Sequence, residues 1–307
     1  MAMDAIQKNL LEKVAGLHEI PEGAYNIRVD GKAYARKSSA NIDIIPIEEK
    51  NGLEIRIKDG TKNESLHIPV ILGASGLREV VYNDFYIGED CDVTIVAGCG
   101  IHNGGDEASE HSGIHSFFVG KNARVKYIEK HYGEGDGKGE RLMNPKSVIT
   151  MAENSYMEMD TCQIKGVDST KRETEAVLAA GATLIVGEKI MTHGNQYAET
   201  AFKVDLNGEG AGVHVVSRSV AKDASRQLFV SEVNGNARSS GHTECDAIIM
   251  DNASVTAVPR VSANHIDASL IHEAAIGKIA GEQLVKLMTL GLSEKEAEET
   301  IVNGFLK

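Results

Sequence analysis

The chain has 307 residues, 42% hydrophobic and 25% charged, which is enough for one large core or two domains. Its net charge of −13 at pH 7 argues against binding to nucleic acid or to an anionic membrane surface. No apolar run approaches the roughly 18 residues of a membrane-spanning helix, and no secretory signal is visible, so we expect a cytoplasmic protein. Four widely spaced cysteines without a CxxC motif predict reduced thiols and no four-cysteine zinc site.

The first predicted element is a short helix over residues 4–15. Apolar residues recur there with helical spacing, at Ile6, Leu10, Leu11 and Val14. Gly16 is a plausible end, and a helix this short needs another element to pack against.

From Asn26 the hydrophobic period changes to two. Residues 42–47 and 53–57 alternate in polarity as strands do, and Lys50-Asn51-Gly52 is a turn signal that could close a hairpin between them.

A repeated turn is the most informative feature of the chain. An Asn, Asp or Gly precedes a small residue, and an alternating apolar run follows. Clear copies occur at residues 88–93, 120–125, 152–157, 179–184, 208–213 and 250–255. Steps near 30 residues are about twice the shorter steps near 14, as in a coil of two or three short strands. The spacing therefore predicts a parallel β-solenoid over residues 21–267, with a Greek-key sandwich as the rival.

Helices are expected at both ends, where they would cap the open coils. We predict an N-terminal helical segment at 1–20 and a C-terminal helical region at 268–307, with one helix ending at Gly291 and the last opening at Ser293. On such a helix Gly277 and Gly281 would share one face with Glu273. The bare backbone of the two glycines would allow either the close approach of another molecule or tight packing of the helix on the solenoid.

Candidate chemistry gathers where the predicted strands give way to these helices. Cys245, His272 and Glu273 supply a thiol, an imidazole and a carboxylate. The plain alternatives are a small buried apolar residue for Cys245 and a surface pair at a helix start for the other two.

A second cluster contains His102, His111 and His115 within a stretch rich in acidic residues. Such a set could hold a divalent metal, and His111 and His115 would project to the same side of a strand. The alternative is a polar loop that runs into a strand. No GxSxG, HExxH, GxGxxG or Walker motif is present.

The C-terminal residues carry a family likeness. The segments 244–250, 272–284, 291–297 and 301–305, together with Pro259, resemble the core of the SufB/SufD family, scaffold components of the SUF system of iron–sulfur cluster assembly. The likeness is close over about sixty residues and looser at 161–166 and 198–203.

The resemblance implies a right-handed parallel β-helix with flanking helices and no catalytic activity. It also implies a homodimer and docking of a SufC-like ABC-type ATPase on the C-terminal helices, with a sulfur donor and apo-protein acceptors as further partners. The implied cargo is a transient iron–sulfur cluster, 4Fe–4S in type.

Individual residues acquire roles only through this resemblance. Cys245 matches the cysteine that receives sulfur or ligates the cluster, Glu273 a carboxylate ligand, and His272 a functional histidine of SufD-type members. On the looser likeness, Cys162 matches a cysteine of sulfur entry and Lys203 a lysine of the sulfur path. Thiolate with a weaker carboxylate suits a site that must release its cluster.

Two other functions remain open at this point. One is a metal-dependent enzyme on a β-helix that uses His102, His111 and His115. The other is a purely structural adaptor.

Overall fold

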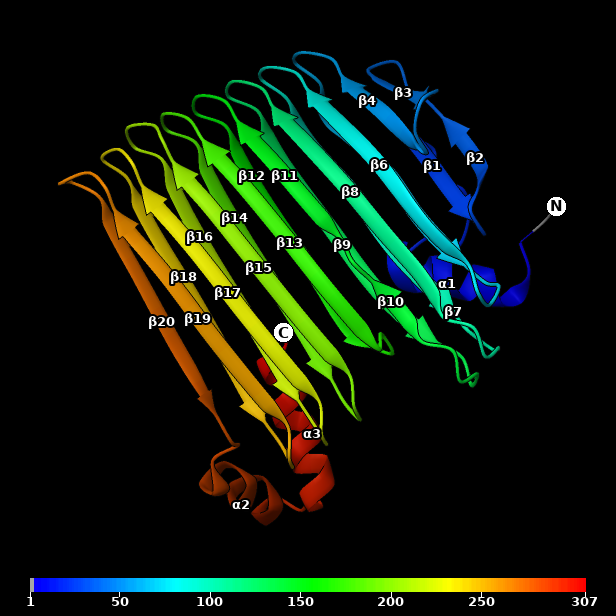
Figure 1. The fold of residues 1–307 in the computed structure, drawn as a ribbon, viewed down its shortest axis with the longest axis vertical. Coiled ribbons are helices and arrows are strands. Elements are labelled where there is room, and N and C mark those ends of the chain that lie inside the picture. The colour runs from blue at the N-terminus through cyan, green and yellow to red at the C-terminus, as the bar shows by residue number, and fades with distance from the viewer. Residues whose placement is uncertain (1–2) are drawn as a thin grey trace.

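The computed structural model describes residues 3–307 and shows a β-solenoid of two sheets that lie face to face (Figure 1). From β5 onward the chain alternates between the sheets, and each new strand pairs in parallel with the strand one coil earlier. The prediction of a parallel β-solenoid is confirmed, and the sandwich is excluded. No helix in the described part of the chain is long and apolar enough to cross a membrane.

Sheet A contains ten strands. In spatial order they are β2 (Lys32–Lys37), β1 (Ala24–Val29), β5 (Lys62–Leu72), β7 (Asp92–His102), β9 (Arg124–Glu134), β12 (Tyr156–Lys165), β14 (Thr183–Thr192), β16 (Gly212–Ala221), β18 (Ser240–Ile249) and β20 (Ser269–Gly277).

Sheet B faces it. In spatial order its strands are β19 (Ser254–Ala263), β17 (Arg226–Gly235), β15 (Tyr197–Leu206), β13 (Ser169–Leu178), β10 (Arg141–Met143), β8 (Ser109–Val119), β6 (Arg78–Ile87), β4 (Gly52–Ile57) and β3 (Ile42–Ile47); β11 (Lys146–Met151) continues the line of β10 between β13 and β8.

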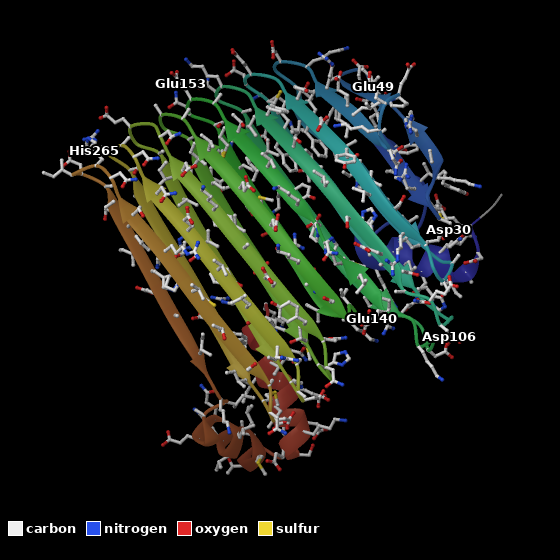
Figure 2. The ribbon with its side chains drawn as sticks, viewed as in Figure 1. Asp30, Glu49, Asp106, Glu140, Glu153 and His265 are labelled. Atoms are coloured by element: carbon white, nitrogen blue, oxygen red, sulfur yellow. The ribbon has the colours of Figure 1, made fainter. Side chains whose placement is uncertain are left out.

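The turn at 250–255 connects β18 of sheet A to β19 of sheet B, whereas the other five repeated turns return the chain from sheet B to sheet A. Their left-handed residues are Asp90, Asn122, Asn154, Gly181 and Gly210, with φ between 53° and 73°. The small residue that follows each one is almost fully buried: Cys91, Ala123, Ser155, Ala182 and Ala211. Glu153 marks this edge in Figure 2, whereas Asp106 and Glu140 mark the opposite edge, where the chain passes from sheet A to sheet B. The repeat therefore corresponds to one coil of two strands, each started by a corner that favours Asn, Asp or Gly.

The core lies between the sheets, where every second residue of strands such as β8, β14 and β15 is buried. Aromatic rings stack between neighbouring coils of sheet B, with the Phe85 and Phe117 centroids 4.6 Å apart and nearly parallel. Alternation thus fixes which side chains face inward, and parallel pairing places equivalent residues above one another.

The N-terminal end of the solenoid is closed by strands. The strands β1 and β2 pair in antiparallel fashion at the end of sheet A, and β3 and β4 do the same at the end of sheet B. The predicted hairpin around Asn51 is confirmed.

Helix α1 (Ala5–Ala15) packs on the flank of sheet A. Asp4 caps it through a capping box with Gln7, as the first turn of a short helix favours. Gly98 and Gly100 present bare backbone on the outer face of β7, so Leu10 and Val14 approach closely. The expectation that this helix caps the open coil was wrong, because α1 covers a flank instead.

The C-terminal segment differs from its prediction in one respect. Residues 269–277 form β20, whereas we predicted a helix from 268, so the helical region begins at α2 (Gly281–Thr289) and continues with α3 (Glu294–Phe305). Residues 269–277 form a full parallel ladder of hydrogen bonds with β18. This tertiary pairing outweighs the helix preference that the spacing of apolar residues such as Ile276 suggests. The left-handed Gly291 and the Ser293–Glu296 capping box occur as predicted.

Helix α3 lies on the outer face of sheet A, as α1 does at the other end. Val302 and Leu306 pack against Val220 of β16, beside Ile248 of β18. Neither terminal helix covers the end of the sheets, and the outer edges of β19 and β20 carry no further strand within residues 3–307.

Candidate functional site

Cys245 lies on β18, one strand inside the open end of the solenoid. Its side chain faces the interior and is 1% exposed, with Ser217 of β16 and Ala274 of β20 beside it in register. Burial raises the pKa of the Cys245 thiol to about 12, and the negative charges of Glu188 and Asp246 add to this. In the isolated chain the group is therefore a protonated thiol at neutral pH.

His272 shares the inner face with Cys245. It lies opposite Thr243, two residues before Cys245 on β18, and its Nδ1 is 2.7 Å from the Thr243 hydroxyl. Its Nε2 is buried without a hydrogen-bond partner. Burial lowers the pKa of His272, and the neighbouring His242 lowers it further, which favours the neutral imidazole needed for metal ligation.

Glu273 lies on the opposite face of the same sheet. It pairs in register with Glu244 on the outer side, and its carboxylate is 3.6 Å from Nε2 of His242. Because successive side chains of a strand alternate, Cys245 and Glu273 do not converge within one chain. The expected helix start at His272 and Glu273 was wrong, since both residues belong to β20.

The open end presents apolar side chains that face the interior elsewhere in the solenoid. On β19 and β20 the inward positions include Val261, which is 45% exposed, and Ile276, which is 38% exposed. These two side chains lie beside the unpaired backbone edges of β19 and β20. Exposed apolar surface beside unpaired edges is typical of a site for another protein chain.

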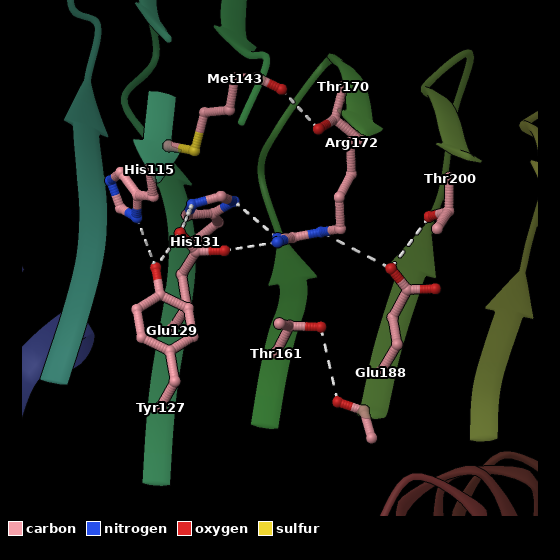
Figure 3. A network of polar contacts seen from close by, with 11 residues as sticks. His115, Tyr127, Glu129, His131, Met143, Thr161, Thr170, Arg172, Glu188 and Thr200 are labelled. Carbon is pink, nitrogen blue, oxygen red and sulfur yellow. Dashed lines mark hydrogen bonds and ion pairs between the residues drawn. The ribbon is translucent and has the colours of Figure 1, made fainter. Parts of the chain in front are cut away.

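A buried polar network runs through the middle of the interior (Figure 3). Arg172 on β13 donates to Glu129 of β9, and its Nε is 3.6 Å from Glu188 of β14. His131 accepts a further hydrogen bond from Arg172 at 3.2 Å. Burial alone would raise the pKa of Glu129, but Arg172 and His131 outweigh this effect and hold it well below its ordinary value.

This network reaches the neighbourhood of Cys245. Glu188 accepts hydrogen bonds from Thr200 at 2.9 Å and from Ser217 at 2.8 Å, and Ser217 is the in-register neighbour of Cys245. A small cavity lined by Glu188, Ser217 and Cys245 lies at this point. Polar and charged groups therefore connect the central coils with the buried thiol.

This network is not predicted by the sequence patterns described above. Arg172 sits in a strand with many polar residues, and only its inward register distinguishes it from the exposed Lys171. Counting alternate residues from the repeated corner would have found it, because the corner fixes which positions face inward.

Cys162 and Lys203 lie outside the interior. Cys162 is half-buried on the outer side of β12, between Lys130 and Lys189 of the adjacent strands. Burial raises the pKa of its thiol, although both lysines oppose the shift. Lys203 is on the outer face of sheet B, exposed and 3.7 Å from Glu232. The two residues thus flank opposite sheets and share no continuous path.

The three histidines of the second cluster are separated. His102 lies on the outer side of β7, 3.8 Å from Glu134. His111 and His115 project to the same side of β8, as predicted; that side is the interior, where they meet His131 of β9. The enzyme site proposed for His102, His111 and His115 is therefore not assembled.

Comparison with known proteins identifies the family of this chain. Residues 80–305 match the family described as SUF system FeS cluster assembly, SufBD core domain. The chain therefore belongs to the SufBD family, which acts in iron–sulfur cluster assembly.

Curated relatives include three archaeal proteins named iron–sulfur cluster assembly SufBD family protein. One from Methanocaldococcus jannaschii is 30% identical over 82% of this chain and 80% of its own length. One from Archaeoglobus fulgidus is 29% identical over 85% of this chain and 69% of its own length. One from Pyrococcus horikoshii is 28% identical over 96% of this chain and 84% of its own length.

Proposed function

We propose that this chain is a non-catalytic scaffold on which an iron–sulfur cluster is assembled and then released. Two copies join at the open ends of their solenoids, and the cluster, which is cargo, is held near that seam. The observation that carries this proposal is the position of Cys245 and His272 on one inner face, at the end that β19 and β20 leave unpaired.

A two-fold contact at this end supplies what one chain lacks. It doubles the number of thiols and imidazoles near the seam, and it covers Val261 and Ile276. Glu273 lies on the edge strand, from which a carboxylate of one copy can reach the seam around the sheet edge. Thiolate, imidazole and carboxylate together form a ligand set weak enough to release a 4Fe–4S cluster.

Cluster binding can be tested by anaerobic reconstitution with ferrous iron and sulfide. Wild-type protein is expected to turn brown, whereas Cys245→Ala loses the visible absorbance and His272→Ala retains a small part of it. Cys91→Ser is the matched control. The equivalent corner two coils later carries a buried serine, Ser155, so a serine is tolerated at this position of a coil. Full absorbance in Cys245→Ala contradicts the assignment.

The seam is tested separately by the mass of the protein in solution. Val261→Lys combined with Ile276→Lys places two charges on the open end and should convert a dimer into a monomer. Val177→Lys is the control, because Val177 is equally exposed but lies on the outer face of sheet B away from the end. Light scattering that shows an unchanged dimer in the double variant excludes this seam.

Helix α2 is the surface that we assign to a SufC-like ABC-type ATPase. None of its residues is buried, and Val285 and Met288 expose apolar side chains near Leu290. Helix α3 contacts α2 and packs on the solenoid through its buried residue Val302. Because α2 presents an uncovered apolar face on a fixed support, a partner can dock there without rearranging the sheets.

Docking is measured with the purified ATPase by calorimetry or pull-down. Val285→Asp with Met288→Asp should abolish binding and leave the melting temperature unchanged, since neither side chain is buried. Unchanged affinity of this double variant for the ATPase removes α2 from the interface.

Transfer of sulfur to the scaffold is the remaining step of the proposal. Cys162 is the thiol that a sulfur donor can reach from outside, whereas the outward position of Lys203 does not support a role on an internal path.

A further inference from the structure

A small enclosed cavity lies between the sheets near the N-terminal end, about ten strands of chain before Cys245. Its volume of about 20 Å³ suits one ion or one water molecule. Sheet B contributes Asn83, His111, Gly113 and His115 to its walls, and sheet A contributes Cys99. Apart from the glycine, these side chains are at least nine-tenths buried.

Two imidazoles converge on one point of this cavity. An ideal Cβ placed on Gly113 would lie 3.5 Å from Nε2 of His111 and 3.0 Å from Nε2 of His115. The missing side chain of Gly113 therefore leaves open the space that both ring nitrogens face. A larger residue would fill it.

The other nitrogen of each imidazole is already held. His111 Nδ1 lies 3.2 Å from Glu79, a carboxylate that Arg28 also contacts at 2.9 Å. His115 Nδ1 lies 2.8 Å from the Tyr127 hydroxyl, which donates to Glu129 at 2.9 Å (Figure 3). In both rings Nδ1 carries the proton in this arrangement, so the lone pair is on Nε2. A carboxylate thus anchors His111 directly and His115 through a tyrosine hydroxyl, and imidazoles anchored through Nδ1 are typical of metal ligands.

Asn83 adds an oxygen that has no partner. Its Oδ1 is buried and accepts no hydrogen bond, while its Nδ2 lies 3.3 Å from Nε2 of His115. An unpaired buried carbonyl oxygen is unfavourable, and a cation would satisfy it. His131 does not compete for this role, because Arg172 donates to its Nδ1.

From this geometry we infer a binding site for one divalent transition-metal ion of the Zn²⁺ or Fe²⁺ class, held by Nε2 of His111, Nε2 of His115 and Oδ1 of Asn83. Among residues 3–307 no three His, Cys, Asp or Glu side chains already surround a common point, so the third protein ligand is the amide. A half-turn of the Asn83 amide exchanges Nδ2 and Oδ1 and places the oxygen beside Nε2 of His115; small rotations of the two rings then close the site on the ion. Imidazole nitrogen with a neutral oxygen matches ions of borderline softness.

This site is independent of the cluster-binding function proposed above. Its ligands come from β6 and β8, whereas Cys245 lies on β18 at the far end of sheet A. An ion here would tie neighbouring strands of sheet B together at the closed end.

The test uses Co²⁺ alone as the probe, in chelator-treated Cys245→Ala protein. We expect one Co²⁺ per chain with visible d–d absorbance and a rise in melting temperature. His111→Ala and His115→Ala should each weaken binding by roughly 100-fold, because each removes a direct ligand. His67→Ala is the control, since His67 lies on the outer side of β5.

A second variant keeps the inference testable if the histidine variants fold poorly. Asn83→Asp retains the shape of the side chain and adds a charge, so Co²⁺ affinity should increase by roughly tenfold. Gly113→Ala should abolish binding with every ligand still present. The inference is overturned if the chelator-treated Cys245→Ala protein binds no Co²⁺, which leaves the cavity to water, or if adding Asn83→Asp makes it bind Co²⁺ no more tightly.

Discussion

The centre and the open end of the solenoid have the same architecture. They differ in whether the polar side chains that face inward are enclosed and hydrogen-bonded. Around Arg172 the charged side chains are enclosed, and each carboxylate has a donor. Around His272 the inward positions are uncovered, and one ring nitrogen lacks a partner. The strands, corners and pairing are alike, so the difference comes only from whether a further coil follows.

Polar residues at the centre therefore serve stability, whereas polar residues at the open end serve assembly with a partner. A coil with neighbours on both sides can bury a charge network because the adjacent strands complete it. A coil with one neighbour keeps groups available for a partner. We expect substitutions at the centre to change folding and substitutions at the open end to change assembly.

The largest effect is expected at Arg172. Arg172→Ala leaves Glu129 and Glu188 buried without their cation, which should lower the free energy of unfolding by about 3–5 kcal/mol. Urea denaturation measures it. Arg238→Ala is the control, because Arg238 pairs with Glu209 on the surface and its loss should be nearly neutral. Equal stability of the two variants would remove the distinction between centre and surface.

The two helical flanks provide a second contrast. Leu10 of α1 is fully buried, so Leu10→Ala should destabilise the protein by about 2–5 kcal/mol. Val285 of α2 is 60% exposed, so Val285→Ala should remain within about 0.5 kcal/mol of wild type. Thermal melts of both variants test whether α2 is free for a partner. A large loss in Val285→Ala would show that α2 is part of the folded core.

Acid should destabilise the centre of the solenoid through Glu129. The pKa of Glu129 is lower in the folded chain than its ordinary value of 4.5, so its stabilising effect is present above that pH and is lost as pH falls through the folded value. Glu129→Gln should be less stable at neutral pH and lose less stability on acidification. Denaturant midpoints over a pH series measure this, with Glu153→Gln in an exposed turn as control. Parallel curves for wild type and Glu129→Gln would contradict the expectation.

The smallest effect concerns the reach of reagents to the thiols. Cys162 is half-buried, whereas Cys91, Cys99 and Cys245 are buried. Iodoacetamide should therefore label Cys162 first in the folded protein, as peptide mass spectrometry can follow. Faster labelling of Cys245 would show that the open end exposes its thiol without a partner.

Much of the fold was predictable because its signals are local. The residue before each corner needs a left-handed conformation, and the sequence supplies Asp90, Asn122 and Gly181 at the required places. Strand β20 was missed because its period resembles that of a helix and its ladder with β18 is formed by residues far earlier in the chain.

The candidate site was predictable only as a set of residue types. Cys245 and His272 could be named from the sequence, but their common face depends on the register between β18 and β20. The same holds for Glu273, whose outward position follows from alternation in a strand and would not follow in a helix.

The corner also makes the length of the solenoid an adjustable quantity. Residues 183–211 form one complete coil, and Thr183 pairs in register with Gly212, so removing this segment would join one corner to the strand start of the next. The inward alternation would be preserved, and Cys245 would come nearer to Arg172 by about one strand spacing of 4.8 Å. Relatives with more or fewer coils could therefore keep the same residues at the open end. Only the distance between the open end and the closed end of the solenoid would change.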